Sequence, residues 1–234
     1  MSTKPILFNT EMVQAILDGR KTVTRRLVKP QPGFFYDVGG RITDPDNPTH
    51  IAFLAMNPDD HEEIRIPQYQ PGDILYVRET WTLLYYVDPN GYTHWDQPMY
   101  YYAADGTPDT TLVDGDGFEL DDQRIRWKPS IHMPKEIARL FLRVKDVRVE
   151  RLQDITDEQA LKEGIKAYWM GDGETGYAVN LESKTFYEGP IGAFARLWES
   201  TIKDKDIGDY GWDANPWVWV IEFEKISKEE AMKC

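Results

Sequence analysis

The sequence has few of the residues that build disulfides, metal centres or membrane spans. Its single cysteine, Cys234, is the last of 234 residues, so it forms no intramolecular disulfide and supports no cysteine-based metal site. Its four histidines are scattered without H-x-x-x-H spacing, which argues against zinc. No apolar run approaches the roughly 18 residues of a membrane helix, and the first residues lack the apolar core of a signal peptide. We therefore expect a cytoplasmic protein with no metal, cofactor or membrane partner.

Positive charge is scarce in the chain as a whole but concentrated near its start. The formal net charge is −13, which argues against broad, non-specific binding to nucleic-acid phosphates. Residues 1–30 nevertheless contain six Lys and Arg and only two acidic residues, so this segment is net positive. The six cations are Lys4, Arg20, Lys21, Arg25, Arg26 and Lys29. A local basic site on an acidic protein suits a small anionic ligand or a short nucleic-acid segment.

Hydrophobic periodicity predicts an α+β protein. We expect helices at 10–18, 156–164 and 189–202, the second opened by a capping box of Thr156 and Gln159. Strands are expected at 5–9, 72–81, 99–106, 124–130, 138–152 and 215–226, with a hairpin at 85–95, and residues 21–28 are expected to form an extended or turn segment. Residues 30–71 and 165–189 are rich in turn residues and are expected to be irregular. Because there is no β-α-β rhythm, the order favours a mixed, mostly antiparallel, barrel-like sheet with flanking helices and long loop insertions.

The basic segment 20–26 has a structural and a functional interpretation. Arg20 and Lys21 directly follow a predicted helix, where cations complement the helix dipole, so a solvated loop would explain them. Arg25 and Arg26 lie farther along, in a β-branched stretch where neighbouring side chains point to opposite faces. One of the two should face inward, and a buried guanidinium needs an anion. The residues alone favour neither interpretation.

The stretch "GRKTVTRR" (19–26) resembles the Gly-x-Lys-x-x-x-x-Arg signature of the ASCH domain family, with Gly19, Lys21 and Arg26 in place. "PGDILYVRETW", "LQDITDEQALKEGI" and "WVWVIEFEKI" resemble, in the same order, later segments of longer ASCH proteins, many of them from phages and prophages. The resemblance implies a PUA-like fold, which is a small β-barrel with flanking helices associated with RNA. It also implies one domain over 1–234, with insertions at about 30–70, 83–125 and 165–190.

One subgroup of the family, the bacterial acetylcytidine amidohydrolases, is thought to use a Lys, a Thr and a Glu. The resemblance places these roles on Lys21, Thr24 and Glu163, and Thr24 stands where the broader ASCH pattern often has Glu. The chemistry is sound, because a Thr hydroxyl is an adequate nucleophile when a Lys of lowered pKa removes its proton. Neighbouring arginines would lower that pKa by like-charge repulsion. A carboxylate at the end of a helix opposes the dipole, which favours the neutral form that a general acid requires.

Two features argue against this assignment. Lys21 and Thr24 are three residues apart, which in a regular strand places them on opposite faces, so they meet only if residues 19–24 form a turn or bulge. Glu163 would be, in the plainest interpretation, an exposed residue on a short helix.

Further substrate-binding residues are predicted in the same basic segment and in "YVRETW" (76–81). They are Arg20, Arg25, Arg26, Arg78, Glu79 and Trp81. Glu79 could pair with Arg26 or Lys21 inside the barrel, and Trp81 could stack on a base. The alternative is a strand whose charged residues face solvent and whose tryptophan belongs to the core.

We therefore expect an ASCH-type protein that binds RNA or a modified nucleoside in a basic cleft and hydrolyses an acyl amide on a base. The alternatives are a non-catalytic RNA-binding module and a ribonuclease that needs no metal. Turnover requires the Lys21 amine within hydrogen-bond reach of Thr24, whereas binding requires only an open basic groove. The sequence leaves the substrate, the protein partners and the oligomeric state open.

Overall fold

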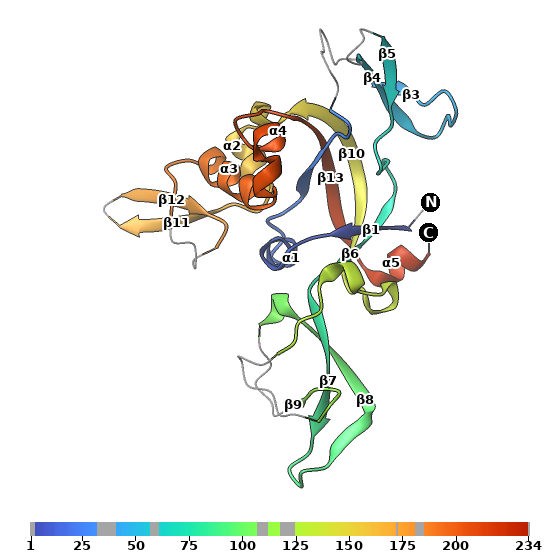
Figure 1. The fold of residues 1–234 in the computed structure, drawn as a ribbon, viewed down its shortest axis with the longest axis vertical. Helices are drawn as coiled ribbons and strands as arrows, with labels where there is room; N and C mark the ends of the chain where they lie inside the picture. The colour runs from blue at the N-terminus through green and yellow to red at the C-terminus, as the bar shows by residue number, and fades with distance from the viewer. Residues whose placement is uncertain are drawn as a thin grey trace.

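A computed structural model of the chain describes residues 3–31, 41–56, 61–106, 112–117, 125–171, 173–180 and 185–233; Cys234 lies outside them. Its centre is a five-stranded sheet in the order β1-β6-β10-β13-β2 (Figure 1). The strands are β1 (Thr3–Leu7), β2 (Val23–Leu27), β6 (Ile74–Arg78), β10 (Phe141–Arg151) and β13 (Trp217–Ile226). Only β1 and β6 are parallel, so the chain has the mixed, mostly antiparallel sheet that the element order predicts.

The described ladders leave the five strands as an open sheet and do not show the closed barrel expected from the sequence. β1 and β2 are its two edges, and no described ladder joins them. The edges nevertheless approach each other, because Arg26 Nη2 on β2 donates a hydrogen bond to the Leu7 carbonyl at the end of β1, at 2.7 Å. A side chain therefore spans the gap that backbone pairing would have to close.

Alternation along β13 divides the core between the two faces of the sheet. Trp219, Ile221 and Phe223 point to one face and join a cluster with residues of β1, β6 and β10. Val218 and Val220 point to the other face and pack against α3 (Pro190–Ser200). Because paired residues of antiparallel strands share a face, this division also orients the side chains of the neighbouring β2.

The helices lie mostly to one side of the central sheet (Figure 1). They are α1 (Thr10–Leu17), α2 (Asp157–Lys162), α3, α4 (Ile207–Tyr210) and α5 (Lys228–Met232). Asn9 caps α1, and the predicted capping box of Thr156 and Gln159 is present at the start of α2. Among the described residues, no helix has the length and apolar character that crossing a membrane requires.

Three smaller sheets lie outside the central one, and two of them occupy the stretches 30–71 and 165–189 that were expected to be irregular, which corrects that prediction. β3 (Arg41–Thr43), β4 (Ile51–Met56) and β5 (Glu62–Arg65) form one three-stranded sheet. β7 (Trp81–Val87), β8 (Thr93–Tyr102) and β9 (Leu112–Val113) form another, which contains the predicted hairpin, and β11 (Lys166–Gly171) pairs with β12 (Glu174–Ala178). All three project from the centre (Figure 1). The strand predicted at 124–130 is wrong over its described part, because only Lys128 forms a bridge, to Trp81.

Candidate functional site

A tight turn after α1 places Lys21 inside the protein. Gly19 has a φ of +75°, which favours glycine, and the backbone amides of Arg20 and Lys21 both donate to the Ala15 carbonyl, at 2.9 and 3.0 Å. The chain enters β2 only at Val23, so Lys21 lies in a turn and not in a flat strand. Lys21 is only 2% exposed, and a lysine is seldom buried without a partner.

The partner of Lys21 is Glu163, the residue that ends α2. Lys21 Nζ donates to Glu163 Oε2 at 2.6 Å and to its carbonyl oxygen at 2.9 Å. Arg25 Nη1 donates to the other carboxylate oxygen, Oε1, at 3.1 Å. Glu163 is 3% exposed, so the interpretation as an exposed surface residue is wrong. Two cations lie against this carboxylate, and the helix dipole is therefore not the dominant charge near it.

Gly164 makes the close approach of α1 and α2 sterically feasible. Its φ is +107°, and a Cβ built there would lie 2.9 Å from Ala15 Cβ and 3.5 Å from Lys21 Cβ. Any larger residue would push on the side chain that carries the buried ammonium. Arg20 also links the end of α1 to the end of α2. It donates through Nη1 to the Gly164 carbonyl and through Nε and Nη2 to Asp18.

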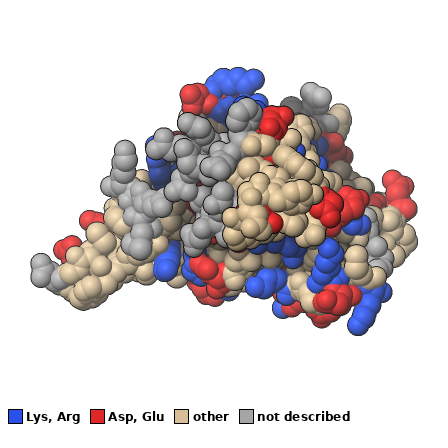
Figure 2. Space-filling view, turned by 90° about the horizontal axis from the view of Figure 1, so that it is seen from below, with Lys and Arg blue, Asp and Glu red and all other residues tan. Residues whose placement is uncertain are grey.

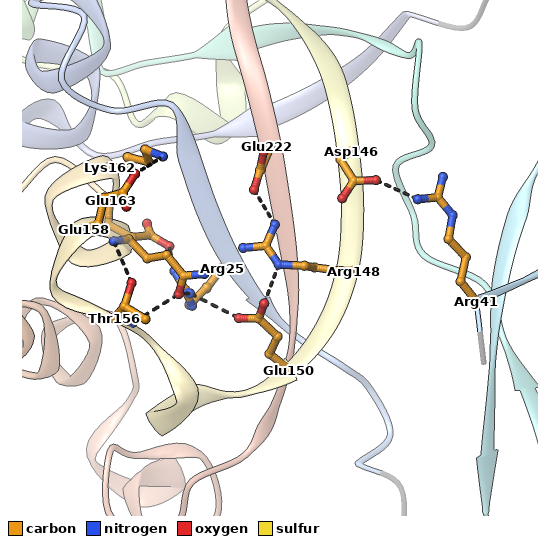
Figure 3. A network of polar contacts seen from close by, with 11 residues as sticks. Arg25, Arg41, Asp146, Arg148, Glu150, Thr156, Glu158, Lys162, Glu163 and Glu222 are labelled. Atoms are coloured by element: carbon orange, nitrogen blue, oxygen red, sulfur yellow. Dashed lines mark hydrogen bonds and ion pairs between the residues drawn. The ribbon is translucent and has the colours of Figure 1, made fainter. Parts of the chain in front are cut away.

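Arg25 extends the ion pair into a wider network (Figure 3). Its Nη2 donates to Gln159 Oε1 at 2.8 Å and to Glu150 Oε2 at 3.4 Å. Arg148 in turn contacts both Glu150 and Glu222. This confirms the prediction that one of the two adjacent arginines is buried and paired with anions. Arg25 faces the side of α2 and α3, since it lies opposite Val220, whereas Arg26 lies opposite Trp219 on the other face.

Burial and neighbouring cations act on the proton of Lys21. Burial lowers the pKa of the Lys21 ammonium below its usual 10.5, Arg26 and Arg25 add to this by repulsion, and Glu163 opposes it. The expected direction is therefore present, but its main cause is desolvation and not the arginines. The Phe8 ring contributes an apolar wall, with its centroid 5.7 Å from Lys21 Nζ and 5.2 Å from Arg26 Cζ.

Thr24 lies close to this cluster but does not form the predicted dyad. Both hydrogen bonds of the Lys21 amine go to Glu163 and neither goes to Thr24. Thr24 instead shares with Glu163 and Arg26 the lining of a small cavity of about 30 Å³, which is large enough for a water molecule. Because residues from both faces of β2 line it, the cavity lies at the unpaired edge of that strand. Thr24 and Glu163 therefore line the same cavity, while the Lys21 amine bonds to Glu163.

Three predicted substrate-binding residues lie away from this cluster. Glu79 is 1% exposed and pairs with Arg139 through two bonds of 2.9 Å, so the expected pairing with Arg26 or Lys21 is wrong. Arg78 Nε donates to the Met133 carbonyl at 2.8 Å. Trp81 is buried and has the Lys128 ammonium 4.7 Å from its ring centroid, which is a packing role and not an open surface for a base.

Several residues that complete the site had little or no signal in the sequence. Gln159 was identified only as part of a capping box, yet its side chain also accepts a hydrogen bond from Arg25. Glu150 lies in β10 and Phe8 directly follows β1, and neither has a local feature that predicts its contact with the basic segment.

The charges of the basic segment are mostly used inside the protein. Arg20 pairs with Asp18, and Lys21 and Arg25 pair with Glu163. On the face seen in Figure 2, acidic and basic side chains are interspersed and do not form a continuous basic surface. Within the described ranges, no group of three or more His, Cys, Asp or Glu is arranged to hold a metal ion. Comparison of the chain with protein-family models, with curated proteins and with solved structures found no match in any of the three.

Proposed function

We propose that the chain is an ASCH-type protein of PUA-like fold that hydrolyses an acyl amide on a modified nucleoside of the acetylcytidine kind. One observation carries the proposal: a buried lysine and a buried arginine hold both oxygens of one glutamate beside a threonine and a water-sized cavity. Burying three charges is costly, and a well-packed apolar cluster would serve stability at least as well. Such an arrangement in a cavity is typical of a site that handles protons.

The geometry supports a division of roles that differs from the Lys–Thr dyad. Glu163 accepts the proton of the Thr24 hydroxyl through a bridging water, and the Thr24 oxygen forms a bond to the acyl carbon. The carbon–nitrogen bond of the amide breaks, and the proton held by Glu163 passes to the leaving amine. Water then hydrolyses the acyl ester of Thr24. Lys21 and Arg25 are positioning residues, because they act through the Glu163 carboxylate whose two oxygens they hold.

An enclosed polar site also distinguishes this function from simple RNA binding. A module that grips phosphates needs cations free to face its ligand. Here Lys21 and Arg25 are buried and paired with a carboxylate, so they are unable to contact an RNA backbone. Their placement supports an internal chemical role more than an external docking role.

The test is release of cytidine from acetylcytidine by the purified protein and by matched variants. We expect Thr24→Val and Glu163→Gln each to lower kcat by about 10²–10⁴-fold, the usual contribution of a proton-transfer group. The matched control is Glu158→Gln, which removes a carboxylate from the same helix, where Glu158 pairs with Lys162 on the surface. Full activity in Glu163→Gln, or no cytidine release by the folded wild-type protein, would exclude the proposal.

A further inference from the structure

A second, larger cavity shares one lining residue, Arg26, with the small cavity of the candidate site. It has a volume of about 320 Å³, which is at the lower end of small-molecule pockets. Lys29, Tyr69, Trp219 and Gln68 also line it. The segment 66–69 between β5 and β6 supplies one wall, and the sheet face of β2 and β13 supplies the other.

The charge of this cavity is opposite to that of the chain. Its nine described lining residues include two cations, Arg26 and Lys29, and no carboxylate. Acidic residues outnumber Lys and Arg by 40 to 27 in the whole sequence, so a cavity with cations alone is an exception to the surrounding composition. Such a local positive potential attracts and retains anions.

Both cations have hydrogen-bond donors to spare. Within the described ranges, neither Arg26 nor Lys29 has a carboxylate within ion-pair distance, unlike Arg20, Lys21 and Arg25. Arg26 donates through Nη2 to the Leu7 carbonyl, which leaves the other N–H donors of its planar guanidinium for a ligand. Lys29 Nζ lies 5.3 Å from the centroid of the Tyr210 ring, a contact that orients the ammonium and does not neutralise it.

The walls suit the less polar part of such a ligand. Tyr69 and Trp219 are both mostly buried, and the Tyr69 hydroxyl donates to the Pro5 carbonyl at 2.8 Å, which fixes the ring. Trp219 is held by Phe53, with the ring centroids 5.4 Å apart. Rigid aromatic walls under two free cations match a ligand that carries both an anionic group and a flat or sugar-like body.

We propose that this cavity binds a phosphate of the substrate, which would make the substrate a phosphorylated nucleoside, either a free nucleotide or a nucleotide unit of RNA. This inference rests on the proposed function for the position of the base. Thr24 and Arg26 lie on the same face of β2 two residues apart, hence about 6.6 Å apart along the strand. A nucleotide whose base reaches Thr24 and Glu163 then has its sugar and phosphate beside Arg26 and Lys29.

The experiment measures binding and therefore needs no turnover. Calorimetry compares cytidine, cytidine 5′-monophosphate and a cytidine tetranucleotide RNA on the wild-type protein and on Lys29→Gln. We expect the monophosphate to bind at least about tenfold more tightly than cytidine, the factor that one charge-assisted hydrogen bond supplies. Lys29→Gln should remove most of that preference, and Arg26→Lys should reduce it because the fork is lost. The matched control is Lys205→Gln, the same change at an exposed lysine that lines neither cavity.

Equal affinities for cytidine and its monophosphate, no binding of either phosphate ligand, or a preference that survives Lys29→Gln would overturn the proposal. Tighter binding of the tetranucleotide, with a loss in Lys29→Gln, assigns the phosphate to RNA; tighter binding of the monophosphate assigns it to a free nucleotide. A phosphate preference without acetylcytidine hydrolysis would retain the cavity and reject the hydrolase. Acetylcytidine hydrolysis without a preference for the phosphate ligand would retain the hydrolase and reject the phosphate site.

Discussion

Replacing Lys21 with methionine tests how much the fold depends on the buried ion pair between Lys21 and Glu163. The substitution keeps most of the side-chain volume but removes the ammonium that donates to Glu163 Oε2 at 2.6 Å and to its carbonyl at 2.9 Å. Glu163 then has only Arg25 as a cationic partner. Removing one member of a buried pair typically costs 3–5 kcal/mol, and because Arg25 remains we expect about 3 kcal/mol. That is a large part of the roughly 5–15 kcal/mol that stabilises an ordinary domain.

A double-mutant cycle separates the pair from the simple loss of side chains. Glu163→Gln should also destabilise, since it leaves the Lys21 ammonium buried without its counter-charge. In the double variant both charges are gone, so its loss should be smaller than the sum of the single losses by about 1.5–3 kcal/mol. Urea unfolding followed by tryptophan fluorescence measures these free energies, and the eight tryptophans of the chain provide the signal.

The chain provides a matched control for this cycle on the same helix. Lys162 and Glu158 form an ion pair of the same length, 2.6 Å, but both side chains are at least half exposed. Surface pairs of this kind often contribute nothing measurable, so Lys162→Met, Glu158→Gln and their combination should leave the unfolding midpoint unchanged. If Lys21→Met were no more destabilising than Lys162→Met, or if the buried cycle showed no coupling, the argument from burial would be refuted.

Three further predictions concern pH, a glycine and the second buried carboxylate. Burial lowers the pKa of Lys21 below 10.5, so just below pH 10.5 the unfolded chain binds more protons than the folded chain. The difference in unfolding free energy between the wild type and Lys21→Met should therefore rise as the pH approaches 10.5. A difference that does not change with pH in denaturation experiments would contradict this. Gly164→Ala should cost more than Gly171→Ala by about 1–3 kcal/mol in thermal unfolding, because both have positive φ but only at Gly164 would a Cβ lie 2.9 Å from α1; equal losses would count against it. Arg139→Gln should cost about 2–3 kcal/mol by leaving Glu79 buried without its partner. Since burial raises the pKa of Glu79, that loss should be larger at neutral than at acidic pH, and the opposite trend would show that Glu79 is not the cause.

Local rules predicted the features of this fold that depend on neighbours in the chain. The capping box of Thr156 and Gln159 follows from the spacing of a few residues, and it is present. The opposite orientation of Arg25 and Arg26 follows from the geometry of any strand, and the structure has it. In each case the physical cause lies within one turn of helix or a few residues of strand.

The errors concern contacts that composition and local patterns do not report. Glu79 was expected near the basic segment, but its partner Arg139 lies 60 residues away on the chain, and no local pattern reports which cation closes on a buried carboxylate. The turn-rich stretches 30–71 and 165–189 were expected to be irregular because turn residues dominate their composition. Their strands are short and pair with their immediate neighbours in sequence, but composition does not record the side-chain packing that decides whether short strands form.

The cations of the basic segment divide according to the geometry of the chain around them. Those nearest the helix, Arg20 and Lys21, are turned inward by the bend at Gly19 and bind groups at the end of α2. Alternation in β2 then sends Arg25 to the same buried network and Arg26 to the opposite face, where it contacts carbonyl and aromatic groups but forms no ion pair with a described carboxylate. Lys21 and Arg25 thus neutralise a carboxylate that the fold buries, and Arg20 pairs with the exposed Asp18. If a bound phosphate supplies the anion for Arg26, as we propose above, the preference for a phosphate should depend on Arg26 and its neighbour Lys29 and not on the number of positive charges in the segment.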